Sequence, residues 1–167
     1  KNTGKSFIKD WIPVEVTSTD EKSISTHERN EPTLSLLIID DEADVRDFLL
    51  NALGEKYLIS TAENGIEGIE KIKQKEPDLV ICDVMMPDMD GFKLCEIIKS
   101  EPATCHIPII LLTALEDTKN RIKGLECRAD DYISKPFSLR HLEIRVEKLI
   151  ENNQRIKEHF SENSFIP

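Results

Sequence analysis

Residues 79–91 read LVICDVMMPDMDG, a short apolar run that ends in an aspartate and passes into a polar loop. Four consecutive apolar residues without alternation are typical of a strand that is buried on both faces of a parallel sheet. Asp83 directly follows this run, and the segment from Asp88 to Gly91 favours a turn. The stretch therefore predicts a buried strand that presents a carboxylate at its carboxyl end.

The same alternation of a strand and an amphipathic helix extends on both sides of this segment, from residue 34 onward. Predicted strands cover 34–39, 57–62, 79–82, 108–112 and 132–134. Predicted helices cover 45–53, 65–75, 92–98, 117–125 and 139–150. Such alternation implies parallel strands joined by right-handed crossovers, with helices on both faces of the sheet. We therefore predict an α/β fold with a doubly wound, five-stranded parallel sheet.

Polar residues follow four of the predicted strands. They are Asp40 and Asp41 after the first, Asp83 after the third, Thr113 after the fourth and Lys135 after the fifth. In open parallel sheets, ligand sites form beyond the carboxyl ends of the strands. We therefore expect three carboxylates, one hydroxyl and one ammonium group to meet in a small volume.

This set of groups predicts a particular chemistry. Neighbouring carboxylates repel and raise one another's pKa, and a hard divalent cation offsets that repulsion. Mg²⁺ prefers oxygen ligands, so Asp40, Asp41 and Asp83 are predicted to form a magnesium site. Lys135 supplies a compact positive charge for a phosphoryl oxygen, and Thr113 supplies a hydroxyl donor. Together they provide what phosphoryl transfer onto a carboxylate requires.

Four segments at the strand ends resemble the receiver domain of two-component response regulators. They are IIDD (38–41), CDVMMPDMDG (82–91), LTA (112–114) and YISKPF (132–137). The resemblance extends over residues 34–151 with every motif in family order, and four motifs together are far more specific than one. It implies a flavodoxin-like fold with strand order 2-1-3-4-5.

The resemblance also implies a role for each acidic residue. Asp83 matches the phosphoacceptor, which attacks the phosphohistidine of a partner histidine kinase. Asp41 would bind Mg²⁺ directly, and Asp40 would act directly or through water. The backbone carbonyl of Met85 matches the third protein ligand of the metal.

The remaining motif residues match groups that sense the phosphoryl group. Thr113 and Lys135 would contact the phosphoryl oxygens. Tyr132 matches an aromatic switch that swings inward when Thr113 moves, and Ala114 matches a small residue beside the pocket. The Lys135–Pro136 peptide bond is expected to be cis.

We therefore expect a phosphoacceptor signalling domain of a phosphorelay rather than an enzyme in the usual sense. Phosphorylation would change the partner affinity of the face formed by segments 117–125, 132–134 and 139–150. The residues two positions after Asp83 and Thr113 flank the path of an attacking water in the family. Here they are the apolar Met85 and Leu115, which predict slow autodephosphorylation.

Other interpretations of these residues stay open at this stage. Asp40 or Asp41 alone would serve as a helix N-cap, and Tyr132 alone would be an ordinary half-buried strand aromatic. One alternative function is a dimerisation or docking module without phosphorylation. Another is a Mg²⁺-dependent aspartyl-phosphate phosphohydrolase, which needs an acid two residues after its nucleophile. Met85 stands there after Asp83, whereas Glu42 keeps that spacing after Asp40.

The two ends of the chain differ from the receiver-like part. Residues 1–33 are polar and are predicted to form a flexible linker, and residues 152–167 a helical extension or linker. Six residues repeat with heptad spacing across this boundary: Leu142, Val146, Leu149, Asn153, Ile156 and Phe160. This seam predicts either a homodimeric coiled coil or a core helix that ends near Ile150 and continues as a frayed polar tail.

Composition limits the classes of partner. The chain has 167 residues and a net charge of −10, which disfavours direct binding to nucleic acid. No apolar run reaches the roughly 18 residues of a membrane helix, and no signal peptide is recognised at Lys1. The four cysteines lack metal-site spacing, so a reducing, cytoplasmic setting is expected, with or without a membrane anchor elsewhere in the protein.

The expected partners follow from the family resemblance. They are a histidine kinase, separate or in the same polypeptide, and a downstream output domain that could bind DNA. The tail from Arg155 to Ser161 resembles the junction of hybrid two-component proteins, which implies that this chain is a fragment of a longer protein.

Overall fold

The computed structural model describes residues 33–114 and 126–162. The strands are β1 (Ser35–Ile39), β2 (Leu58–Ala62), β3 (Leu79–Asp83), β4 (Ile109–Thr113) and β5 (Asp131–Ser134). The helices are α1 (Ala43–Leu53), α2 (Gly65–Gln74), α3 (Gly91–Ser100) and α5 (Leu139–Glu162). The predicted linker and the predicted helix 117–125 lie outside the described residues, apart from Thr33.

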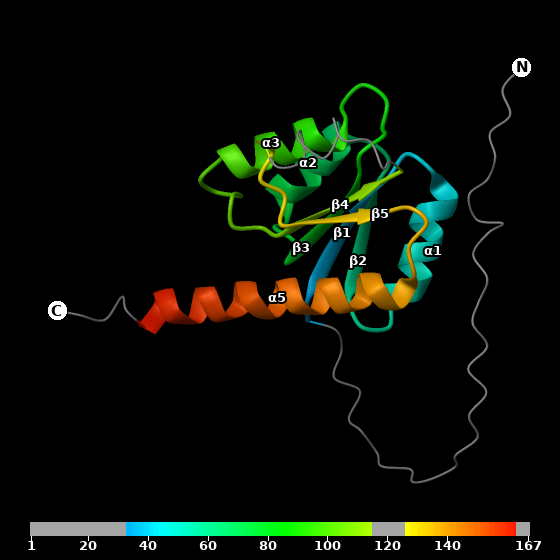
Figure 1. Cartoon of the computed structure of the whole chain (residues 1–167). Coiled ribbons are helices and arrows are strands. Elements are labelled where there is room, and N and C mark those ends of the chain that lie inside the picture. The colour runs from blue at the N-terminus through cyan, green and yellow to red at the C-terminus, as the bar shows by residue number, and fades with distance from the viewer. Residues whose placement is uncertain (1–32, 115–125, 163–167) are drawn as a thin grey trace, which may run out of the picture.

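The five strands form one parallel sheet in the order β2-β1-β3-β4-β5 (Figure 1). This confirms the predicted fold class and strand order. Consecutive side chains of a strand point to opposite faces, so β1 contributes to two cores. Leu37 and Ile39 pack on the side of α3, whereas Leu36 and Ile38 pack on the side of α1 and α5. A strand buried on both faces needs an unbroken apolar run, which is why the sequence pattern predicted this strand.

Two caps fix where helices begin near the carboxyl edge of the sheet. The side chain of Asn64 accepts a hydrogen bond from the Glu67 N–H at the start of α2, and Asp90 accepts one from the Lys93 N–H at the start of α3. Gly91 begins α3 in close contact with β3, because an added Cβ would lie 2.4 Å from the Asp83 carbonyl oxygen. The glycine is therefore required by this close approach, and no glycine of the described residues has a positive φ.

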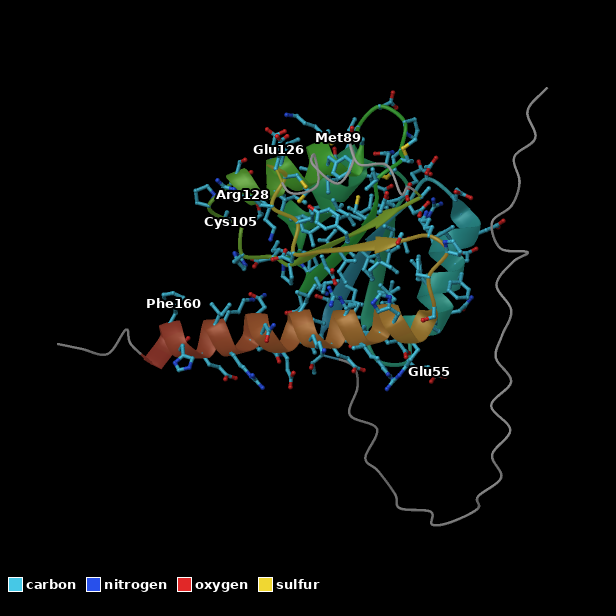
Figure 2. The ribbon with its side chains drawn as sticks, in the orientation of Figure 1. Glu55, Met89, Cys105, Glu126, Arg128 and Phe160 are labelled. Carbon is cyan, nitrogen blue, oxygen red and sulfur yellow. The ribbon has the colours of Figure 1, made fainter. Side chains whose placement is uncertain are left out.

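Helix α5 is longer than the core requires. Leu142, Val146 and Ile150 are buried against the sheet, but the helix continues to Glu162. Its last residues extend past the sheet, where Phe160 is 73% exposed (Figure 2). The alternative of a frayed tail after Ile150 is therefore wrong, since residues 151–162 are rich in good helix formers. The coiled coil stays a prediction.

Neither α5 nor any other helix within residues 33–114 and 126–162 combines the length and the apolar character needed to cross a bilayer.

Candidate functional site

Three aspartates meet at the carboxyl edge of the sheet. Asp40 follows β1 and is 1% exposed, Asp83 ends β3 and is 4% exposed, and Asp41 is open to solvent. One carboxylate oxygen of each lies within 4.8 Å of the others. The parallel topology explains this convergence, because β1 and β3 are neighbours and both end at this edge.

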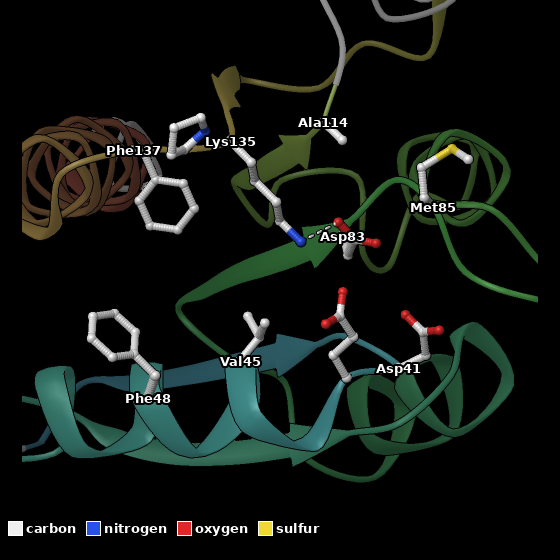
Figure 3. Close-up of a pocket in the computed structure, with 10 residues that line it drawn as sticks. Asp41, Val45, Phe48, Asp83, Met85, Ala114, Lys135 and Phe137 are labelled. Carbon is white, nitrogen blue, oxygen red and sulfur yellow. Dashed lines mark ion pairs between the residues drawn. The ribbon is translucent and has the colours of Figure 1, made fainter. Parts of the chain in front are cut away.

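One ammonium group faces the buried carboxylates. Lys135 Nζ lies 2.8 Å from Asp83 Oδ1, an ion pair drawn in Figure 3. It also lies 3.4 Å from Asp40 Oδ2. The Lys135 N–H donates to the Thr113 carbonyl at 2.7 Å, which continues the pairing of β5 with β4. The peptide bond between Lys135 and Pro136 is cis, as expected. One ammonium group therefore pairs with both buried carboxylates of the three-aspartate cluster.

The pKa values reflect this imbalance. Burial raises the pKa of Asp83 to about 6, although the hydrogen bond and charge of Lys135 act in the opposite direction. Burial likewise raises the pKa of Asp40 despite its contact with Lys135. For Lys135, burial lowers the pKa, but the charge of Asp40 and the hydrogen bond with Asp83 outweigh it and raise the pKa overall. The pocket therefore disfavours the ionised form of Asp83 and Asp40.

The backbone around Asp40 is fixed by short polar contacts. Asp40 Oδ1 accepts a hydrogen bond from the Glu42 N–H at 2.9 Å, and Arg46 donates to the Asp40 carbonyl at 2.6 Å. Glu42, rather than Asp40 or Asp41, is the N-cap of α1, and its side chain makes no capping bond. Asp40 thus orders the loop that leads into α1 without being the cap itself.

A cavity of about 260 Å³ opens beside the aspartates (Figure 3). Asp41, Asp83 and Lys135 line its polar end. Its other wall is apolar: Val45, Phe48, Pro136 and Phe137. Glu42, Met85 and Ala114 complete the lining, and Met85 is 60% exposed. The cavity therefore offers a charged end for a phosphoryl group and an apolar wall for whatever carries it.

The predicted switch residues lie beside this cavity rather than in it. Thr113 ends β4 and is partly buried, next to Ala114. Tyr132 in β5 packs against the core on the α3 side, and its hydroxyl shares a 3.5 Å hydrogen bond with Cys127 Sγ. Leu115 lies outside the described residues. The contact with Cys127 was not predicted, because no local spacing connects the two residues.

This chain is similar to known proteins in both sequence and fold. Residues 36–147 match the family model described as the response regulator receiver domain. This chain belongs to the receiver domain family of two-component response regulators. Receiver domains bind Mg²⁺ at an acidic pocket, and they pair with histidine kinases and output domains.

Curated relatives include both kinases and regulators. This chain is 39% identical over 142 residues to histidine kinase P4 of Formosa agariphila, covering 85% of this chain and 10% of that protein. It is 45% identical over 116 residues to the transcriptional regulatory protein ResD of Bacillus subtilis, covering 69% of this chain and 47% of that one. The chain thus spans about a tenth of the kinase and about half of the regulator.

Solved structures agree with the fold. The signal receiver domain of a signal transduction histidine kinase from Syntrophus aciditrophicus has a TM-score of 0.68 and 38% identity, covering 71% of this chain and 90% of that one. The chemotaxis protein CheY4 of Vibrio cholerae has a TM-score of 0.66 and 26% identity, covering 70% and 98%.

Proposed function

We propose that this receiver domain accepts a phosphoryl group on Asp83 from the phosphohistidine of a histidine kinase, in a reaction that depends on Mg²⁺. The observation that carries the proposal is the site itself. The Asp83 carboxylate lies within 4.8 Å of two further carboxylates and 2.8 Å from a single ammonium group. A nucleophile with this surplus of negative charge needs a cation before it can accept a phosphate.

The residues present fit a hard cation. Asp40, Asp41 and Asp83 offer oxygen ligands, and the backbone carbonyl of Met85 is proposed as a further ligand. Mg²⁺ bound there would neutralise charge on the phosphoryl oxygens and on the aspartates. The open side at Asp41 leaves room for water ligands, which Mg²⁺ usually retains.

The chain's own groups carry out the transfer. A carboxylate oxygen of Asp83 attacks the phosphorus, the bond from phosphorus to the imidazole nitrogen breaks, and an acyl phosphate forms. Lys135 is positioned to exchange its contact with Asp83 Oδ1 for one with a phosphoryl oxygen. Its ammonium group then faces a negatively charged oxygen throughout the transfer. The Thr113 hydroxyl donates to another phosphoryl oxygen.

Signal output is proposed to follow from the same contacts. When Thr113 moves toward the phosphoryl group, Tyr132 turns inward and the surface around β5 and α5 changes its affinity for partners. This is a population shift between two states, with a coupling of roughly 1–3 kcal/mol.

The wider setting is also a proposal. Residues 34–151 would form the receiver domain, with linkers at 1–33 and 152–167, and the domain would act as a signalling module in the cytoplasm rather than as an enzyme. The kinase relative supports a phosphodonor in the same polypeptide, and the transcriptional relatives support a DNA-binding output domain. The heptad seam of α5 supports a homodimer.

Intact mass spectrometry tests the proposal. Incubation with acetyl phosphate and Mg²⁺ is expected to add about 80 Da, the mass of one phosphoryl group. The adduct should be lost in Asp83→Asn and on chelation with EDTA. Asp88→Asn is the matched control, because Asp88 is exposed in the same loop and asparagine tolerates its positive φ of 66°.

Two results would contradict the proposal. Absence of an adduct in the wild-type protein would favour a docking module without phosphorylation. Steady release of phosphate from an added phosphate ester would favour the phosphohydrolase.

A further inference from the structure

Two cysteines meet on the opposite side of β5 from the acidic pocket. Cys95 lies in the middle of α3, and Cys127 lies in the turn 126–128 that precedes β5. The Cys95 thiol donates to the Cys127 carbonyl oxygen at 3.2 Å, and the interaction between the two side chains shifts the pKa of each thiol. The Tyr132 hydroxyl contacts Cys127 Sγ on its other side at 3.5 Å.

The other two cysteines lack this arrangement. Cys82 is fully buried in β3, and its thiol contacts the Asp83 carbonyl oxygen. Cys105 is exposed in the segment before β4. No disulfide joins these four cysteines, all of which lie within the described residues. Of the four, Cys95 and Cys127 are the pair joined by a hydrogen bond, from the Cys95 thiol to the Cys127 carbonyl oxygen.

Both cysteines are buried, but Cys127 keeps 5% of its surface exposed, whereas Cys95 keeps none. Cys127 lines an open surface cavity of about 280 Å³, together with residues at the start of α3 and Glu126. Glu126 and Arg128, its neighbours in the chain, lie beside α3 (Figure 2). Cys95 is completely buried behind Cys127. A small oxidant therefore meets Cys127 first.

The hydrogen bonds prepare Cys127 for attack. They come from the Cys95 thiol, the Tyr132 hydroxyl and the Ala129 N–H, and they lower the pKa of Cys127 although burial opposes them. The interaction with the Cys127 side chain raises the pKa of Cys95, as does burial. Because the thiolate is the reactive form, the accessible cysteine is also the nucleophilic one.

We propose that Cys95 and Cys127 form a peroxide-reactive pair that closes to a disulfide. The Cys127 thiolate attacks one oxygen of hydrogen peroxide, the O–O bond breaks, and a sulfenic acid forms as hydroxide leaves. Cys95 then loses its proton and attacks the Cys127 sulfur, the S–O bond breaks, and hydroxide leaves and is protonated to water. In total, two thiols are oxidised to one disulfide and one peroxide is reduced to two waters.

The reaction has a direct consequence for Tyr132. A disulfide sulfur is neutral and no longer a thiol, so the hydroxyl of Tyr132 loses the partner that holds it on the α3 side. Oxidation would thereby act on the residue that phosphorylation is proposed to move. This second step rests on the proposed function, whereas disulfide formation itself does not.

Thiol chemistry tests the first step in the 167-residue chain without any phosphodonor. The Cys105→Ser variant, which cannot form exposed intermolecular links, is treated with a small excess of hydrogen peroxide. We expect a mass loss of about 2 Da, a cross-linked peptide that joins Cys95 to Cys127, and reversal by dithiothreitol. If peroxide leaves three free thiols, the pair is not reactive and the proposal is wrong.

Single variants on the same background test the order of events. In Cys95→Ser, the sulfenic acid on Cys127 should persist, add about 16 Da and react with dimedone. In Cys127→Ser, Cys95 should stay unmodified because solvent does not reach it. Equal oxidation of Cys95 in that variant would contradict the assigned roles.

A tyrosine titration tests the second step. Tyr57→Phe leaves Tyr132 as the single tyrosine, since the chain has two. Burial and the bond with Cys127 raise the pKa of Tyr132, so its ultraviolet titration should shift to lower pH after oxidation. The shift should persist with Asp83→Asn, which separates this step from phosphorylation. An unchanged titration in the cross-linked protein would overturn the link to Tyr132.

Discussion

Buried aspartates occur at both edges of the sheet, and their surroundings differ. At the amino end of β5, Asp131 pairs with Arg145, and Asp130 pairs with Lys99 at 2.7 Å. Each of these carboxylates has its own cation. At the carboxyl edge, three carboxylates converge, and Lys135 pairs with two of them, Asp40 and Asp83. Burial of acidic groups is common to both edges, whereas unbalanced charge marks the edge with the candidate site.

The comparison predicts its largest effect at the acidic pocket, where stability should depend on pH. The pKa of Asp83 is about 6 in the folded chain, against 3.8 for an aspartate carboxyl exposed in the unfolded chain. Stability from this group is therefore fully present below pH 4 and is lost as the pH rises through 6. In EDTA, the wild-type chain should lose about 3 kcal/mol more than Asp83→Asn between pH 4 and pH 8.

Urea unfolding across this pH range measures the effect. Mg²⁺ is the control, because bound cation offsets the cost of ionising Asp83 and should remove most of the difference between the two proteins. If the free energies of unfolding of wild type and Asp83→Asn changed in parallel with pH in EDTA, ionised Asp83 would cost no stability. The proposed difference between the two edges of the sheet would then be wrong.

The balanced edge should respond to loss of its cation by a smaller amount. Arg145→Ala leaves Asp131 buried without its partner and should lower the free energy of unfolding by about 2 kcal/mol, less than for a fully buried pair because the Arg145 side chain is 42% exposed. Arg140→Ala on the same helix is the matched control. Its side chain is 72% exposed, so it should change stability by less than about 0.5 kcal/mol.

Chemical denaturation of both variants at neutral pH distinguishes the two contacts. Equal losses in Arg145→Ala and Arg140→Ala would mean that the ion pair at Asp131 contributes no more than a surface pair.

The smallest predicted effect concerns water at the acidic pocket. Met85 lines the cavity with an exposed apolar side chain and cannot orient a water molecule for attack on the acyl phosphate. Met85→Asn should shorten the lifetime of the phosphorylated protein about tenfold, which corresponds to about 1.4 kcal/mol. Met85→Leu, which keeps the site apolar, should leave the lifetime unchanged.

Loss of the phosphoryl adduct over time, followed by intact mass in Mg²⁺ buffer, gives both rates. A wild-type half-life of only seconds, or equal rates in the two variants, would refute the role of Met85.

The fold was predictable because its decisive signals are local. The three central strands β1, β3 and β4 are apolar runs, and the segment from Leu79 to Asp83 shows its polar end directly in the sequence. The convergence of Asp40, Asp41 and Asp83 followed from topology alone, since parallel strands end at a common edge. The strand order and the cis bond before Pro136 came from the family resemblance rather than from the pattern.

Contacts between distant residues were not predictable in this way. Cys95 and Cys127 are 32 positions apart, and no spacing rule connects a helix residue to a turn residue at that separation. The ion pair between Asp131 in β5 and Arg145 in α5 also joins two separate elements, so no spacing rule predicts it. The sequence left the continuation of α5 past Ile150 open between a helix and a frayed tail, because polar residues without a core face resemble a linker.

That continuation has a mechanical consequence. From Ile150 to Glu162 the helix adds about 18 Å beyond the part that packs on the sheet. A rod that is anchored at one end converts a small tilt at its base into a larger displacement at its tip. The helix also fixes the direction, around its own axis, in which the chain continues after Glu162. Deleting a single residue from the exposed half would turn everything downstream by about 100°, while the acidic pocket and the sheet would remain as they are.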